Sequence, residues 1–123
     1  MRQYLPHSLG GISYWLVIML ALASMVTAET VEVEIFRKEY IPQKLTINRG
    51  DTVRWVNKER RQYHSVWFKE LGEEDGEYFW PEEVFERTFD VVGTFAYRCG
   101  PHPKMTAVIH VRSDSVPPDS PTP

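Results

Sequence analysis

One short segment of the chain gathers three side chains that bind soft metal ions. Cys99, His102 and Met105 follow one another at intervals of three in the run Cys-Gly-Pro-His-Pro-Lys-Met. Cys99 is the only cysteine, and a second histidine, His64, lies upstream after a strand-like run. A thiolate, two imidazoles and a thioether form the ligand set of a mononuclear copper site that passes single electrons. The sequence therefore predicts a redox-active copper centre.

Each member of this set also has a purely structural interpretation. A lone cysteine is more often a small buried hydrophobe, and Met105 would also fit as a gap-filling core residue before an apolar strand. The spacing favours ligands instead, because a tight loop after a strand end can wrap three side chains around one point. Pro101 and Pro103 flank His102 and fix two φ angles, which gives the loop a pre-set shape.

The remaining histidines are weaker candidates than His64. His110 lies inside a strand-like run, where it alternates with Ile109 and Val111. A period of two places it on the opposite face from these apolar residues, so we expect it to face solvent or to be satisfied on the sheet. His7 falls in an N-terminal segment that we expect to be removed.

The elements that must position these side chains have the pattern of strands. Val31, Val33 and Ile35 alternate with charged residues, and the same period of two recurs along the chain. We expect strands over residues 31–35, 45–47, 52–57, 65–68, 85–89, 94–98 and 107–111. Helical signals are nearly absent, and the one weak candidate is a single turn over 81–84. Short strands separated by turns predict an all-β sandwich or barrel.

The N-terminus has the pattern of a secretory signal. Arg2 and His7 precede an apolar run over residues 12–26, which ends in small residues. We expect residues 1–28 to be cleaved and the protein to be exported to the periplasm. The alternative is an uncleaved membrane anchor, because the run over 10–28 is nearly long enough to span a bilayer.

The rest of the chain is expected to form one domain and a tail. Residues 29–112 are long enough for a single copper-binding domain, and residues 113–123 are rich in Ser, Pro and Asp, which predicts a disordered tail. An exported domain of this size often carries disulfides, but a chain with one cysteine forms none internally. Metal ligation gives this lone thiol a purpose.

The charged residues exclude one class of partner and suggest another. The formal net charge is −3 at pH 7, and loss of Arg2 with the signal would make it −4. This mild acidity argues against nucleic acid as a partner. Acidic residues cluster over 70–86, where Glu73, Glu74 and Asp75 are candidates for partner docking. The ordinary interpretation is a solvated loop face, and the functional one is a patch that steers a basic redox partner.

These runs resemble the cupredoxins, the type 1 or blue copper proteins. Residues 93–111 are similar to the cupredoxin copper loop and last strand, and residues 42–57 and 64–66 are similar to the middle strands. The short spacing from His102 to Met105 resembles that of the amicyanins, whereas plastocyanins and pseudoazurins have longer loops. The resemblance covers nearly all of the chain after the signal, and it implies a Greek-key β-sandwich with copper near one end.

The resemblance also implies roles for individual residues. One copper ion would have three equatorial ligands and one weak axial thioether, which are His64, Cys99, His102 and Met105. His102 would lie near the surface and provide the electron route, inside an apolar docking patch formed with Pro101 and Pro103.

Four residues are expected in the shell around the ligands, and they are Asn57, Ser65, Pro101 and Pro103. Cupredoxins commonly carry an asparagine directly after the first histidine, where its side chain ties the two ligand loops together. Ser65 stands at this position. A serine hydroxyl can make one such hydrogen bond but not the pair that an asparagine side chain makes, so we expect the two ligand loops to be held together less firmly. The acidic segment 72–80 has no counterpart in the cupredoxin pattern.

Three functions fit these residues to different degrees. We expect a monomeric periplasmic electron carrier, not an enzyme, that shuttles between a redox donor and an acceptor, for example a dehydrogenase and a cytochrome. A copper-binding or delivery protein without a redox role is the alternative, and it is disfavoured because Met105 is the only methionine after the signal. A cysteine enzyme with Cys99 as nucleophile is weaker, because the nearby base His102 is held between two prolines.

Overall fold

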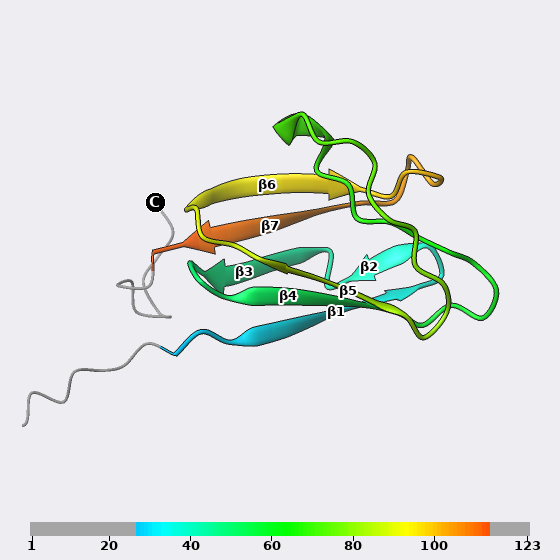
Figure 1. The fold of residues 1–123 in the computed structure, drawn as a ribbon, viewed down its shortest axis with the longest axis horizontal. Coiled ribbons are helices and arrows are strands. Elements are labelled where there is room, and N and C mark those ends of the chain that lie inside the picture. Colours follow the sequence, from blue (N-terminus) through cyan, green and yellow to red (C-terminus); the bar gives the residue numbers. More distant parts are fainter. Residues whose placement is uncertain (1–26, 114–123) are drawn as a thin grey trace, which may run out of the picture.

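The fold is seen in a computed structural model that describes residues 27–113 (Figure 1). The signal predicted over 1–28 and the tail predicted over 113–123 therefore lie outside the described residues, except at their inner ends. Within the described part of the chain, no helix is long and apolar enough to cross a membrane.

Seven strands in the described range form two sheets that pack face to face (Figure 1). The strands are β1 (Thr30–Phe36), β2 (Glu39–Ile41), β3 (Lys44–Asn48), β4 (Thr52–Asn57), β5 (Val84–Thr88), β6 (Gly93–Arg98) and β7 (Thr106–Arg112). One sheet has the order β2-β1-β4-β5 and the other β3-β7-β6. The β1–β4 and β3–β7 pairs are parallel, and the other pairs are antiparallel. This arrangement confirms the predicted Greek-key β-sandwich.

The alternation in the sequence decides which face of each strand enters the core. In β1, Val33 and Ile35 are fully buried while Glu32 and Glu34 are exposed. Trp55 of β4 is fully buried at the centre of the core. Four aromatic rings surround its indole, and they belong to Phe68, Phe85, Phe89 and Tyr97. Each of these large side chains contributes a large apolar area to the core.

The segment before the acidic cluster departs from the predicted strand pattern. Residues 65–68 form no ladder, and only two isolated bridge pairs hold this stretch, His64 with Phe79 and Trp67 with Arg98. The two pairs involve different partner segments, so the stretch crosses from one to the other and builds no continuous strand.

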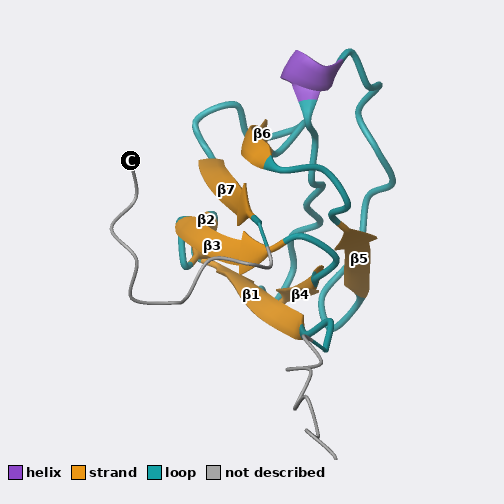
Figure 2. Cartoon of the chain, turned by 90° about the vertical axis from the view of Figure 1, so that its left-hand side faces the viewer, coloured by secondary structure: helices purple, strands orange, loops and turns teal. Residues whose placement is uncertain are grey.

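Two short elements also differ from the sequence prediction. The structure adds β2, whose three residues are too few for alternation to show. The turn predicted over 81–84 is not helical, and Val84 already begins β5. The single helical turn of the described residues lies at Lys69–Leu71 beside β6 (Figure 2), where Gly72 ends it with a φ of 74°. A left-handed residue at this position closes the turn and is most easily a glycine.

Removing one hydroxyl from the core should test how the Trp55 indole is satisfied. Its Nε1 donates to the Tyr97 hydroxyl over 3.1 Å, and both side chains are buried. Tyr97→Phe leaves this N–H without a partner, so we expect a loss of about 1–3 kcal/mol in unfolding free energy. Urea titration of the metal-free protein measures it. Tyr63→Phe, at an exposed tyrosine, is the control, and an equal change in the two variants would contradict the expectation.

Candidate metal centre

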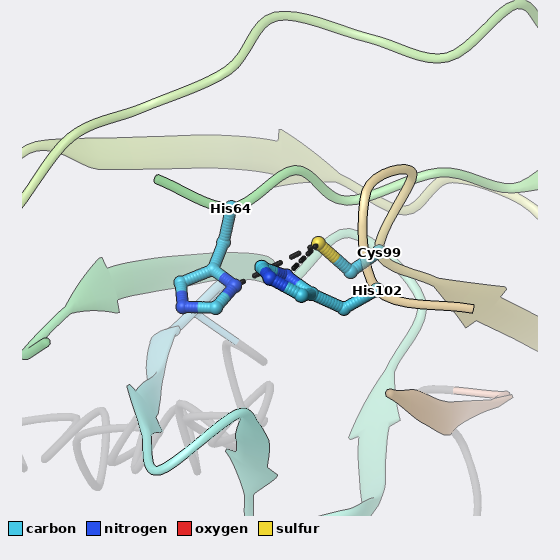
Figure 3. Close-up of side chains that lie close together, drawn as sticks. All are labelled: His64, Cys99 and His102. Atoms are coloured by element: carbon cyan, nitrogen blue, oxygen red, sulfur yellow. Dashed lines mark hydrogen bonds between the residues drawn. The ribbon is translucent and has the colours of Figure 1, made fainter. Parts of the chain in front are cut away.

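Three of the predicted ligands meet at one end of the sandwich (Figure 3). Cys99 directly follows β6 and is fully buried, as is His64, whereas His102 is half-buried. The Cys99 Sγ lies 3.7 Å from His64 Nδ1 and 3.6 Å from His102 Nδ1. One ligand atom from each residue lies within 4.8 Å of the others. The fold therefore brings together His64 and Cys99, which are 35 residues apart in the chain.

The loop from Cys99 to Met105 is closed by its own backbone. The Cys99 N–H donates to the Met105 carbonyl over 3.0 Å, and the Met105 N–H donates to the His102 carbonyl over 2.9 Å. The Arg98 guanidinium donates to the carbonyls of Cys99 and Gly100 over 3.1 and 2.9 Å. Met105 is 4% exposed and is part of the core cluster. These bonds fix the backbone that carries both Cys99 and His102.

The segment that carries His64 is held to the acidic segment by a reciprocal backbone pair. The His64 N–H donates to the Phe79 carbonyl over 3.1 Å, and the His64 carbonyl accepts from the Phe79 N–H over 3.0 Å. The buried Asn57 amide donates to the carbonyls of Gln62 and Phe79 over 2.8 and 3.1 Å. Asn57 thus holds the chain in place both before His64, at Gln62, and at its partner Phe79.

Glu59 lies next to His64, and sequence reasoning did not single it out. Its Oε1 is 3.5 Å from His64 Nε2 without completing a hydrogen bond. The same oxygen accepts the Lys38 N–H over 2.7 Å. A carboxylate behind an imidazole favours the ring orientation in which the other nitrogen faces the metal site. Nothing in the spacing from Glu59 to His64 indicates this contact, because the loop between them folds back.

Both imidazoles are shifted toward their neutral form. Burial lowers the pKa of His64, and the nearby His102 adds to this effect. Burial also lowers the pKa of His102, and the positive charge of Lys38 acts in the same direction. Neutral imidazole is the form that binds metal ions. A buried thiol with two neutral imidazole nitrogens facing it is a donor set that fits copper, so these residues suit the ion that the sequence predicts.

The residues expected near the ligands or at a docking surface lie in different environments. Pro101 is half-buried and Pro103 is exposed, on either side of His102. Ser65 is fully buried, and its N–H donates to the Cys99 Sγ over 3.3 Å.

The three acidic docking candidates are not equivalent. Glu73 makes a two-pronged ion pair with Arg87, at 2.6 and 2.8 Å, and this partner lowers the pKa of the Glu73 carboxyl. Asp75 is half-buried and accepts hydrogen bonds from Ser65 and Tyr78. Glu74 is exposed.

His110 lies where strand periodicity places it. It is exposed on β7, and its Nδ1 lies 3.0 Å from the Thr94 hydroxyl. It takes no part in the cluster of His64, Cys99 and His102.

A β-sandwich with one buried cysteine and two histidines at its end defines a class of mononuclear metal proteins, and comparison with known proteins gives the family. Residues 27–112 match the model of the family described as copper binding proteins, plastocyanin/azurin family. The chain belongs to this family.

Amicyanins are among its relatives. Amicyanin of Paracoccus versutus is 37% identical over 93 residues, which are 72% of this chain and 70% of the relative. Amicyanin of Paracoccus denitrificans is 34% identical over the same shares of the two chains. The Cu(I) form of a methionine-to-alanine variant of amicyanin is a similar solved structure, with a TM-score of 0.64 and 33% identity, covering 72% of this chain and 88% of that one.

The lowered pKa values of the two imidazoles predict a pH-dependent stability of the metal-free protein. A folded-state pKa below the unfolded value of about 6.5 means that the unfolded chain binds more protons between the two values. The unfolding free energy should therefore fall as the pH drops below about 6.5. Urea titrations at about pH 7.5 and about pH 5.5 measure this fall.

Two variants make that measurement specific. His102→Gln removes one of the shifted groups, so the fall in stability should become smaller. His110→Gln removes an exposed imidazole that lies outside the cluster, and it is the matched control. Identical falls in the wild type and His102→Gln would show that the slope has another origin.

Proposed function

We propose that this protein is a type 1 copper electron carrier in which His64, Cys99 and His102 bind the copper ion and Met105 is the weak axial ligand. The observation that carries the proposal is the buried convergence of one thiol and two imidazole nitrogens within 4.8 Å. Membership of the plastocyanin/azurin family of copper-binding proteins and the similarity to amicyanins support it. The protein binds one copper ion and transfers electrons, and it is not an enzyme.

The ligand types suit this task. When bound, copper supplies a one-electron couple between Cu(II) and Cu(I), and thiolate and imidazole donors bind both states. Cys99 and His64 are shielded from water, so the site is kept in a low-dielectric environment. Copper bound there would be protected from solvent by the protein's own side chains.

The two imidazoles differ in access to the surface, which gives the electron a route. His64 has no exposed surface, whereas His102 is half-buried at the end of the molecule. We therefore assign the path between copper and a partner protein to His102. Its neighbours Pro101 and Pro103 would form an apolar rim on which a partner docks.

Hydrogen bonds and two prolines restrain the loop that holds these ligands, and such restraint suits electron transfer. Ligand movement during a change of oxidation state adds to the barrier for transfer. The cross-loop hydrogen bonds between Cys99 and Met105 and between Met105 and His102 oppose such movement, as do the fixed φ angles of Pro101 and Pro103.

The partners are redox donor and acceptor proteins, for example a dehydrogenase and a cytochrome. Glu74, which is exposed, is the best placed of the three acidic candidates to steer a basic partner, because Glu73 and Asp75 already bind other side chains. Export to the periplasm is supported by the signal-like sequence over 1–28. We propose that the carrier works there as a monomer.

Visible absorption of the Cu(II)-loaded protein tests the proposal directly. Residues 29–123 loaded with Cu(II) should show an intense blue band that bleaches on reduction and returns on oxidation, because thiolate-to-copper charge transfer produces the colour. Cys99→Ser should abolish the band. A colourless complex that does not cycle would overturn the electron-carrier proposal and favour copper delivery.

Replacing the methionine tests its role as axial ligand. Met105→Leu keeps a similar volume, so the metal-free protein should lose less than about 1.5 kcal/mol of unfolding free energy. The variant should still bind copper and stay blue, but its reduction potential should rise, because Cu(II) loses a weak electron donor. Voltammetry of the wild type and the variant gives the comparison. An unchanged potential would remove Met105 from the ligand set.

A further inference from the structure

Every polar group of Ser65 is engaged, although the residue is fully buried. Its N–H donates to the Cys99 Sγ, and its carbonyl accepts from the Tyr40 hydroxyl over 2.6 Å. Its Oγ accepts the Gly100 N–H over 2.9 Å and also lies 2.8 Å from Asp75 Oδ1. Ser65 therefore lies between the segment that carries His64 and the loop that carries Cys99.

The hydroxyl has a single proton, and this decides how its two bonds are shared. The Gly100 N–H supplies its own proton, so the Ser65 oxygen must accept on that side. The hydroxyl proton is then left for Asp75, whose carboxylate is an acceptor only. The carboxylate thus sets the rotation of the hydroxyl and keeps a lone pair directed at Gly100. Hydrogen bonds to a charged group are the stronger ones, so this orientation is well fixed.

The Asp75 carboxylate also packs directly against the metal-binding loop. A Cβ placed on Gly100 would lie 1.7 Å from Asp75 Oδ2, so a side chain at residue 100 would force the carboxylate out of this position. The same oxygen accepts the Tyr78 hydroxyl over 2.8 Å, which holds the carboxylate from its outer side. Asp75 is half-buried, in contrast to the exposed Glu74 beside it.

We propose that Asp75 is a positioning residue of the copper site. Its carboxylate fixes Gly100 through the Ser65 hydroxyl, and so fixes the first residues of the loop over 99–105. The proposal rests on the copper site argued above, and it assigns to the acidic segment a role inside the molecule. The charge of Asp75 would have a second effect, because a negative group packed against Gly100, the residue after Cys99, favours Cu(II) over Cu(I).

Two substitutions separate the hydrogen bond from the charge. Asp75→Ala removes both the acceptor and the charge. Asp75→Asn keeps an oxygen that accepts from Ser65 and removes only the charge. Glu74→Ala is the matched control, because it removes the same charge from the neighbouring exposed position.

The first measurement is the rate of amide hydrogen exchange at Gly100 in the metal-free protein, and NMR monitors this exchange. Asp75→Ala should speed this exchange about fivefold, the factor that corresponds to the loss of a typical hydrogen bond. Asp75→Asn and Glu74→Ala should leave it near the wild-type rate. Equal exchange in Asp75→Ala and Glu74→Ala would overturn the positioning role.

The second measurement is the reduction potential of the copper-loaded proteins. Both Asp75→Ala and Asp75→Asn should raise it, and Glu74→Ala should raise it less, because its carboxylate is exposed and screened. A potential that rises equally in all three variants would overturn the specific placement of Asp75. A change confined to rates with a protein partner would instead assign Asp75 to docking.

A second variant keeps the proposal testable if Asp75→Ala does not fold. Ser65→Ala removes the relay itself, so it should speed Gly100 exchange to a similar extent. Where Asp75→Ala does fold, combining it with Ser65→Ala should add nothing to the exchange rate, since the two residues act through one path. If the wild type failed to form a blue copper centre, the proposed function would fall, but the exchange results on metal-free protein would still decide the role of Asp75.

Discussion

The proposed metal centre depends on the junction between the segments that carry His64 and Cys99, where the Ser65 N–H donates to the sulfur of Cys99, 34 residues further along the chain. This hydrogen bond sets the chain carrying His64 against the loop carrying Cys99 and His102. Both atoms are buried, and in such a low-dielectric place a hydrogen bond is strong while an unpaired donor is costly. The sandwich brings these two segments together, because β6 ends at Arg98, directly before the cysteine, and the chain after β4 returns to it.

The acidic segment shows how charge in a sequence can serve the inside of a molecule. The Glu73 carboxylate pairs with Arg87 of β5, and its backbone carbonyl accepts the Trp67 indole N–H over 2.8 Å. Asp75, from the same segment, bonds the Ser65 hydroxyl and packs against Gly100 of the loop over 99–105. Two acidic side chains of this run are therefore anchored to the sandwich, and exposed neighbours such as Glu74 remain at its surface. A run of carboxylates gives no sign of this division.

The unequal burial of the two imidazoles connects the fold to the function. His64 is enclosed because it pairs with Phe79 and lies against Glu59. His102 stays half-buried because it lies at the tip of the loop between β6 and β7. One histidine thus anchors the site inside the protein and the other connects it to the surface. Under the proposed function, this asymmetry would let an ion shielded from water exchange electrons with a partner.

The features that the sequence determined are local ones. Alternation over five or six residues predicted most of the strands and the two-layer fold, because side chains of a strand point to opposite faces by geometry alone. The spacing of Cys99, His102 and Met105 predicted a metal-binding loop, since residues of one tight loop lie close in any fold. The same alternation placed His110 on the exposed face of β7. The short strand β2 escaped this reasoning, because three residues carry too little periodicity.

What tertiary structure alone decided is which distant groups meet. No pattern in the sequence indicates three of these contacts: Glu59 with His64, the bonds from Asp75 through Ser65 to Gly100, and the bridge from His64 to Phe79. We expected Ser65 to connect the two ligand segments less firmly than an asparagine would. Its hydroxyl has a further partner in Asp75, which no sequence motif indicates. Side-chain periodicity specifies which face of a strand is buried, and close spacing specifies which residues share a loop. Which residues of two different loops meet is fixed only when the two sheets pack and bring their ends together.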